Sequence, residues 1–490
     1  MKIAFVSSEV FPFAKTGGLG DVSCSLPMEL SKFSVDTKVF MPKYYHIDEK
    51  KFNLQYIWTA GGILIHAAGK VYPVQFYKGK LPNSNIDIYF VDSPHHFHRF
   101  NIYTNDKDED ERFLVFNKAV IEFIQRIQWK PDIIHCNDWQ TGILPLLVKE
   151  NYNWDRSFDR TAYVFTIHNV AYQGRFSPAV MEKAGLSRKY FYPTGPVEYY
   201  GDFSFLKTGI CFSEVVNTVS ETYAKELLTP EYGEGMQDVL KAKGEDFSGI
   251  LNGVDYNVWN PDTDRLIHFN YSSADMTCKS KNKKFLLEQH NLEFNENIPL
   301  IGIVSRLATQ KGFDIFMDAI HNLEDLNAQW VVLGSGEGKY ENMFRQLSEQ
   351  YPDKFIAHIG FNNQLSHQIE AASDIFLMPS HFEPCGLNQI YSLKYGTIPV
   401  VRKTGGLADT VQDWDEYNYA GLNTGSGFSF NDYSSSALES SVIRAVNYFH
   451  NKKTWKQIQQ NGMMKDYSWK TSAEKYLKLY YKAIQKRNGK

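Results

Sequence analysis

The sequence predicts an α/β protein with two doubly wound, Rossmann-like domains. Short apolar runs alternate with amphipathic stretches from one end of the chain to the other, and most of these runs lack polar alternation. Strands that are apolar on both faces are typical of a parallel sheet covered by helices on both sides. A chain of 490 residues is long for one hydrophobic core and comfortable for two domains of about 200–250 residues each.

The predicted strands are short and rich in β-branched residues. They span residues 2–7, 37–41, 86–91, 132–136, 163–167 and 215–219 in the first half, and 300–305, 330–333, 355–359, 375–378 and 398–401 in the second. Between them, apolar residues recur at spacings of three and four, which predicts helices over 111–127, 313–323 and 340–351. Alternation of strands and helices favours doubly wound sheets.

A polar stretch over residues 260–299 separates the two series of strands and contains one short helical pattern. We therefore predict a first domain over 1–258 and a second over 259–468. Residues 469–490 carry apolar side chains at helical spacing, so the chain is expected to end in a docked helix.

Composition excludes several classes of function. With 52 Lys and Arg against 56 Asp and Glu, the net charge of −4 disfavours a nucleic-acid or anionic-membrane partner. The five cysteines are odd in number and lack CxxC spacing, so neither a disulfide framework nor a cysteine zinc site is indicated, and a cytoplasmic location is expected. No apolar run approaches the ~18 residues of a membrane helix, and the N-terminus has the pattern of a strand rather than a signal peptide.

One loop sequence occurs twice, Lys-Thr-Gly-Gly-Leu-Gly-Asp at 15–21 and Lys-Thr-Gly-Gly-Leu-Ala-Asp at 403–409, each time after a predicted strand. Glycines let backbone amides turn toward an anion, a helix N-terminus adds positive potential, and Lys15 supplies a point charge. The first copy is interpreted as a phosphate or sugar contact, with a simple tight turn as the alternative.

Two further strand ends carry charged groups. Arg306 and Lys311 follow the strand at 300–305, and this pair suits a diphosphate better than a solvated turn. Glu383 follows the strand at 375–378, directly before a proline and a Gly-Leu pair that opens a helix. Cys385 has no identifiable base, so a packed thiol is favoured over a nucleophile.

In the first domain, Asp138 and His168 also lie at predicted strand ends. Either residue alone would be read as structural, but two on neighbouring strand ends favour a functional role. The glycine-rich segment 334–338 lacks the acidic residue of a nicotinamide site. Asp-x-Asp triplets occur only in polar, loop-like segments, so no metal–nucleotide clamp is expected.

With these motifs in place, the chain resembles bacterial glycogen synthases and plant starch synthases essentially from end to end. The strongest blocks are residues 3–21, 248–255, 304–312 and 374–410. The resemblance implies the GT-B architecture, in which two Rossmann-like domains face a central cleft and a final helix crosses back to the first domain.

The resemblance also implies a reaction: transfer of glucose from ADP-glucose to the 4-hydroxyl at the non-reducing end of glycogen or another α-1,4-glucan, with retained configuration and without a metal or other cofactor. UDP-glucose stays open as the donor. A glucan phosphorylase is a weaker alternative because no motif identifies a cofactor lysine. A non-catalytic glucan-binding protein is disfavoured by the intact charged residues.

Matching motif to motif, the resemblance implies two sets of site residues. The catalytic set is Glu383, Asp138, His168, Lys311 and Arg306. The substrate-binding set is Lys15, Gly18, Asp21, Asn252, Cys385, Gly386, Leu387, Thr404, Gly405 and Gly406. The chain departs from the family pattern at Gln140 and His381, where His and Arg are usual, and segment 94–109 matches poorly. Related transferases often carry a second Glu where this chain has Tyr391, as in the starch-synthase branch, and this weakens a ribose-binding inference.

Overall fold

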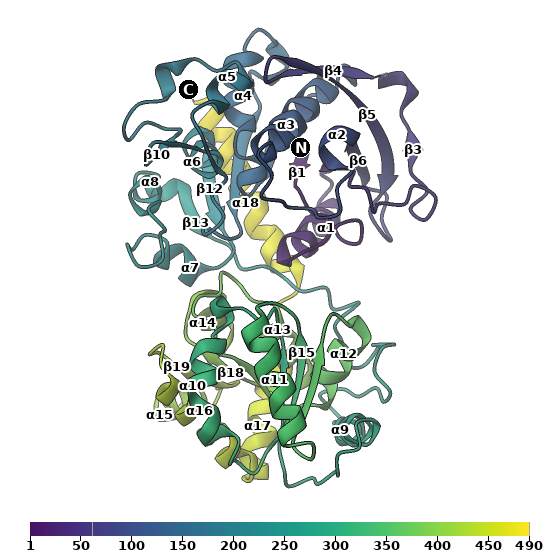
Figure 1. Cartoon of the computed structure of the whole chain (residues 1–490), viewed down its shortest axis with the longest axis vertical. Helices are drawn as coiled ribbons and strands as arrows, with labels where there is room; N and C mark the ends of the chain where they lie inside the picture. The colour runs from purple at the N-terminus through teal and green to yellow at the C-terminus, as the bar shows by residue number, and fades with distance from the viewer. Residues whose placement is uncertain (61, 490) are drawn as a thin grey trace. The chain divides into compact units, whose positions relative to one another are not determined.

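The computed structural model describes residues 1–60 and 62–489, and the chain divides into two compact units (Figure 1). Unit 1 comprises Met1–Gly253 and Trp469–Lys490, and unit 2 comprises Val254–Ser468. Each unit has its own sheet with helices packed on it. None of the described helices combines the length and hydrophobicity needed to span a bilayer.

The sheet of unit 1 is parallel through its centre, in the order β13-β12-β8-β7-β1-β2-β6. Every residue of β7 and β8 is buried, as predicted for strands covered on both faces. The strand order reverses between β1 and β7, which creates a topological switch point. The strands are β1 (Lys2–Val6), β2 (Asp36–Pro42), β6 (Asp87–Asp92), β7 (Ile133–Asn137), β8 (Ala162–Ile167), β12 (Val215–Thr218) and β13 (Phe247–Gly249).

An antiparallel extension of this sheet was not predicted. It consists of β3 (Gln55–Tyr56), β4 (Ile63–Ala67) and β5 (Lys70–Lys80), with β5 pairing antiparallel to β6. Alternate residues of β4 are buried and exposed, because one face of this edge packs inward and the other meets solvent. A second small sheet joins β9 (Arg175–Phe176), β10 (Glu198–Tyr199) and β11 (Asp202–Ser204).

Helices cover the sheet of unit 1. The predicted helix at 111–127 corresponds to α3 (Glu109–Arg126), most of which is buried. The others are α1 (Gly18–Ser31), α2 (Pro94–Phe97), α4 (Leu144–Asn151), α5 (Val180–Ala184), α6 (Phe205–Phe212), α7 (Glu221–Glu226), α8 (Gln237–Lys241) and α18 (Trp469–Asn488).

The sheet of unit 2 is parallel throughout the paired strands, in the order β16-β15-β14-β17-β18-β19, and its order reverses between β14 and β17. Its strands are β14 (Leu300–Val304), β15 (Gln329–Gly334), β16 (Phe355–Ile359), β17 (Ile375–Met378), β18 (Ile398–Arg402) and β19 (Phe428–Phe430). Its helices are α9 (Thr277–Gln289), α10 (Phe313–Leu323), α11 (Gly338–Gln350), α12 (Asn363–Ala372), α13 (Asn388–Tyr395), α14 (Gly405–Thr410), α15 (Trp414–Tyr419), α16 (Ser435–Phe449) and α17 (Lys452–Met463).

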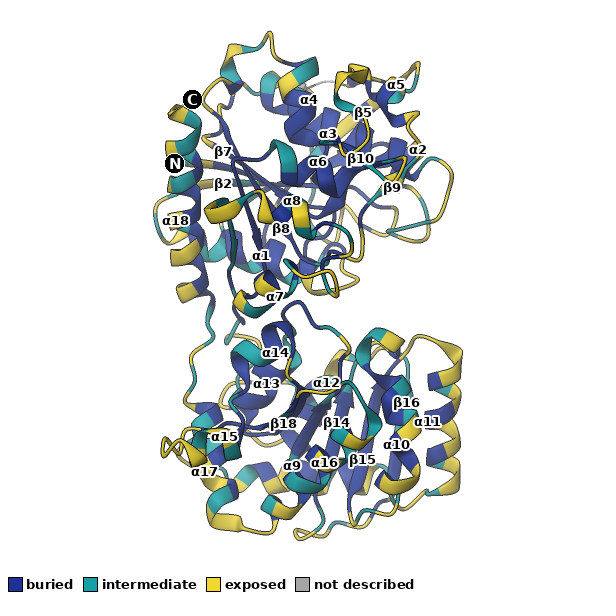
Figure 2. Ribbon diagram, turned by 90° about the vertical axis from the view of Figure 1, so that its left-hand side faces the viewer, coloured by how far each residue is buried: buried dark blue, intermediate teal, exposed yellow. Residues whose placement is uncertain are grey.

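The C-terminal helix α18 packs on unit 1 with one side buried and the other exposed (Figure 2). Beneath it, Thr166 Oγ1 donates its one proton to Asn217 Oδ1 at 2.7 Å. The same oxygen must therefore accept the hydrogen bond that it forms with His135 Nε2 at 2.6 Å. His135 Nδ1 therefore accepts from the hydroxyl of Tyr480 at 2.9 Å. Asn217 Nδ2 also donates to the hydroxyl of Tyr476. The helix is thus joined to the sheet by a buried hydrogen-bond network.

We predict that Tyr480→Phe lowers the free energy of unfolding of the full chain by about 1–3 kcal/mol, because it leaves His135 Nδ1 buried without its donor. Tyr481→Phe on the same helix is the matched control, since Tyr481 is 57% exposed, and should change stability by less than about 0.5 kcal/mol. Urea unfolding checks both values. Equal stability of the two variants would contradict this role.

Candidate functional site

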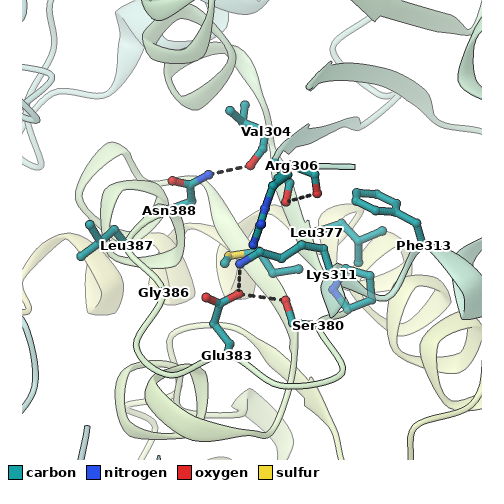
Figure 3. A pocket seen from close by; sticks show the side chains of 13 residues that line it. Val304, Arg306, Lys311, Phe313, Leu377, Ser380, Glu383, Gly386, Leu387 and Asn388 are labelled. Atoms are coloured by element: carbon teal, nitrogen blue, oxygen red, sulfur yellow. Dashed lines mark hydrogen bonds and ion pairs between the residues drawn. The ribbon is translucent and has the colours of Figure 1, made fainter. Parts of the chain in front are cut away.

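The candidate site of unit 2 lies at the switch point of its sheet. The segments that follow β14 and β17 line a pocket of about 180 Å³, together with the start of α13 (Figure 3). Ligand sites in open α/β sheets occur at this position, beyond the carboxyl ends of the strands where the order reverses. Five of the predicted residues line the pocket: Arg306, Lys311, Glu383, Gly386 and Leu387.

An ion pair joins the two loops. Lys311 Nζ donates to Glu383 Oε2 at 2.5 Å, and Ser380 Oγ donates to the same oxygen at 3.0 Å (Figure 3). Glu383 is only 6% exposed, so the lysine supplies the charge that its burial requires. Gly312 permits the approach: its φ is +79°, and a Cβ there would lie 2.0 Å from the carbonyl oxygen of Pro379.

The remaining polar groups make the pocket electropositive. Arg306 extends beside Lys311 and donates to Gln310 Oε1 at 3.2 Å. Asn388 Nδ2 donates to the carbonyl of Val304 at 2.6 Å, which fixes the start of α13 against the end of β14. The residue that precedes α13, Leu387, makes no side-chain capping hydrogen bond to the first amides of the helix. The cations and the helix N-terminus therefore favour an anionic ligand.

The second copy of the glycine loop packs against the Glu383 segment and does not itself line the pocket. The amide of Gly406 donates to the carbonyl of Glu383 at 3.2 Å. A Cβ on Gly405 would lie 2.0 Å from the same carbonyl oxygen, and one on Gly406 would lie 2.1 Å from that of Cys385. Thr404 and Cys385 are buried, and none of the four is among the residues lining the pocket. Their contacts hold the Glu383 segment in place.

The first copy of the loop lies in unit 1, after β1 at the switch point of that sheet. Lys15 Nζ pairs with Asp21 Oδ2 at 2.7 Å, and Gly18 begins α1. The loop amides already bind an anion, because Glu9 Oε2 accepts from the amides of Thr16 at 2.6 Å and Gly17 at 3.2 Å.

Glu9 was not among the site residues predicted from the sequence. Glu9 is 3% exposed, and its carboxylate also accepts hydrogen bonds from the hydroxyls of Thr16 and Tyr103, each at 2.7 Å. The signal available in the sequence was an acidic residue between the first strand and the glycine loop.

Asp138 and His168 come together at the ends of β7 and β8. Asp138 Oδ1 accepts from the amide of His168 at 2.7 Å, and the backbone of Asp138 has a φ of +54°. His168 Nε2 donates to Asn137 Oδ1 at 3.0 Å. Burial raises the pKa of Asp138 to about 7 and lowers that of His168 to about 3. His168 is therefore a neutral hydrogen-bonding group near pH 7.

The predicted site residue Asn252 and the aromatic residue Tyr391 have distinct surroundings. Asn252 belongs to unit 1 and is 4% exposed, and its Oδ1 has no hydrogen-bond partner among the described residues. Tyr391 stacks on Trp259 with ring centroids 3.9 Å apart, and His367 stacks on Trp259 at 3.7 Å. Position 391 thus has a packing role in unit 2.

The raised pKa of Asp138 predicts a pH-dependent stability. Between its ordinary pKa of 3.8 and the folded value of about 7, the native state holds a proton that the unfolded state has lost. This group's contribution to stability therefore falls as pH rises through that window. Asp138→Asn has no titrating group here, so its stability does not fall for this reason. The free energy of unfolding of the variant, minus that of the wild type, should therefore increase from pH 5 to pH 7.

Urea unfolding at pH 5, 6 and 7 measures this difference. Asp238→Asn is the matched control, because the Asp238 side chain is 82% exposed, and its difference from wild type should not depend on pH. A pH-independent difference for Asp138→Asn would contradict the assignment.

Comparisons with known proteins agree with this arrangement. The family described as "Starch synthase catalytic domain" matches residues 2–242, and "Glycosyl transferases group 1" matches residues 286–462. Glycogen synthases of Thermosipho africanus and Thermotoga maritima are each 43% identical to the chain, and each match covers 99% of it. The match covers 100% of the Thermosipho protein and 99% of the Thermotoga protein.

The fold is also shared with a solved structure. The catalytic domain of starch synthase IV from Arabidopsis thaliana, bound to ADP and acarbose, is 32% identical and matches with a TM-score of 0.92 over 99% of both chains. The predicted GT-B class, with two Rossmann-like domains, is confirmed. The chain belongs to the glycogen and starch synthase family and is a glycosyltransferase.

Proposed function

We propose that the chain is a cytoplasmic glycogen synthase that transfers glucose from ADP-glucose to the 4-hydroxyl at the non-reducing end of an α-1,4-glucan, with retained configuration. The observation that carries the proposal is the pocket where Arg306 and Lys311 meet the buried carboxylate of Glu383. Relatives named glycogen synthase and the ADP and acarbose bound to the Arabidopsis starch synthase support this choice of product, donor and acceptor.

The charges of the pocket suit departure of a nucleoside diphosphate. Breaking the bond between glucose and phosphate builds negative charge on the diphosphate, and preorganised cations stabilise that charge most. Arg306 offers a planar fork and Lys311 a compact ammonium, while the start of α13 adds backbone amides. These groups supply the stabilisation directly, so the proposed reaction needs no metal or other cofactor.

Glu383 would stabilise the sugar as positive charge develops on its ring. Its Oε2 is held by Lys311 and Ser380, and an ion-paired carboxylate is a weaker nucleophile than a free one. We therefore assign Glu383 electrostatic support rather than covalent attack. In that case the leaving phosphate accepts the proton of the acceptor hydroxyl, and the glucose is transferred with its configuration retained.

In unit 1, we propose that Lys15, Gly18 and Asp21 contact the donor. Lys15 is 42% exposed along its side chain, so it can exchange its pair with Asp21 for a phosphate. His168, which is neutral, and Asp138 would form hydrogen bonds with hydroxyls of the transferred glucose. Asn252, with its unpartnered Oδ1, would accept a hydrogen bond from a sugar.

The test measures incorporation of labelled glucose into glycogen from ADP-glucose or UDP-glucose. We expect incorporation from ADP-glucose at a rate well above that from UDP-glucose. Preferential use of UDP-glucose would overturn the donor assignment, and incorporation from neither would sink the proposed reaction.

Lys15→Gln should lower kcat/KM for ADP-glucose about tenfold or more, since a hydrogen bond to a charged group contributes about 1.5–3 kcal/mol. The matched control is Lys403→Gln in the second copy of the loop, where Lys403 pairs with Glu416 at 2.7 Å. That variant should keep nearly full activity. Equal losses in both variants would remove the donor role of Lys15.

A further inference from the structure

A cluster of two imidazoles and a carboxylate lies in unit 1, apart from the residues assigned above. His95 and His96 belong to α2, and Glu111 belongs to the first turn of α3. One potential ligand atom from each residue lies within 4.8 Å of the others. The two histidines fall within segment 94–109, which matches the family pattern poorly.

His96 is oriented toward the cluster by a neighbouring hydroxyl. Its side chain is fully buried, and Nδ1 is hydrogen-bonded to Ser93 Oγ at 2.8 Å. Its Nε2 has no hydrogen-bond partner among the described residues and lies 3.7 Å from Glu111 Oε1. A buried ring nitrogen without a hydrogen bond is costly, and it is placed as a ligand atom would be.

The carboxylate of Glu111 also lacks a strong cationic partner. The acidic residues before it are paired: Arg112 with Glu109, and Lys183 with Asp110 at 2.8 Å. Glu111 is 7% exposed, and within the described ranges its only ion-pair contact is with His96. Glu111 Oε1 also accepts a hydrogen bond from the hydroxyl of Tyr72. A hydroxyl supplies no positive charge, and buried charges are normally compensated by an opposite charge, so a bound cation would complete this site.

We propose that His95, His96 and Glu111 bind a divalent transition-metal ion of the zinc type, with water as the fourth ligand. Imidazole nitrogens and one carboxylate suit Zn²⁺, whereas Mg²⁺ and Ca²⁺ take oxygen ligands. Metal–nitrogen bonds of about 2.1 Å in a tetrahedron place ligand atoms about 3.4 Å apart. The cluster reaches this spacing by a small movement of His95, whose side chain is exposed.

The ion would fasten the segment between β6 and α3. Arg112 Nε donates to the carbonyl of His96 at 2.8 Å, and Arg112 Nη2 donates to that of Ile102 at 3.1 Å. The next residue, Tyr103, donates to Glu9, which holds the glycine loop. Metal binding therefore stabilises a segment that supports this loop, and its role is structural.

The test titrates Zn²⁺ alone into metal-free full-length protein by calorimetry, and records the visible absorption of Co²⁺ in the same site. We expect one equivalent to bind with tetrahedral Co²⁺ bands. His95→Ala should weaken binding at least tenfold; because His95 is exposed, this variant should fold normally, as circular dichroism will show. Ser93→Ala should weaken it about 10–100-fold, as loss of an orienting group does.

His321→Ala is the matched control. His321 is 88% exposed along its side chain and lies 3.5 Å from Glu324, which makes it an ordinary surface pair. This variant should bind Zn²⁺ as the wild type does. Failure of the wild type to bind one equivalent, or equal affinity in the wild type and His95→Ala, would overturn the proposal. Neither result bears on glucose transfer, which is measured separately.

Discussion

The ion pair between Lys311 and Glu383 is the interaction on which the candidate site depends. It joins the segments that leave β14 and β17, the two strands between which the sheet order reverses. A carboxylate this deeply buried would be unfavourable without its lysine. The same lysine adds positive charge where a diphosphate would bind. Lys311 therefore compensates the buried charge of Glu383 and also contributes to binding the diphosphate.

Close backbone approach is the constraint that makes this contact possible. Gly312 and Gly405 both have positive φ. A Cβ on Gly312 would lie 2.0 Å from the carbonyl oxygen of Pro379, and a Cβ on Gly405 would lie 2.0 Å from that of Glu383. Any larger residue would push the loops apart. The second glycine loop therefore acts through packing against Glu383 and Cys385, whereas the first presents Lys15 and is organised by Glu9.

Most of the fold could be predicted because buried parallel strands have a strong signature. All the predicted strands are present, and the helix at 313–323 matches α10 residue for residue. The edge strands β4 and β5 were not predicted because one face of each meets solvent, so their buried residues alternate with exposed ones and form no continuous buried run. Arg306, Lys311 and Glu383 could be predicted because they come directly after strands. The roles of Glu9 and Ser380 come from tertiary hydrogen bonds, which residue spacing does not reveal.

A double-variant cycle on transfer from ADP-glucose measures whether Lys311 and Glu383 act as one unit. Lys311→Met, Glu383→Gln and the combined variant are compared by kcat/KM. Residues that act as one unit give non-additive losses, so we expect the double variant to have a kcat/KM within about threefold of the slower single variant. Losses that multiply would show that Lys311 and Glu383 act independently, and that the site does not depend on their ion pair.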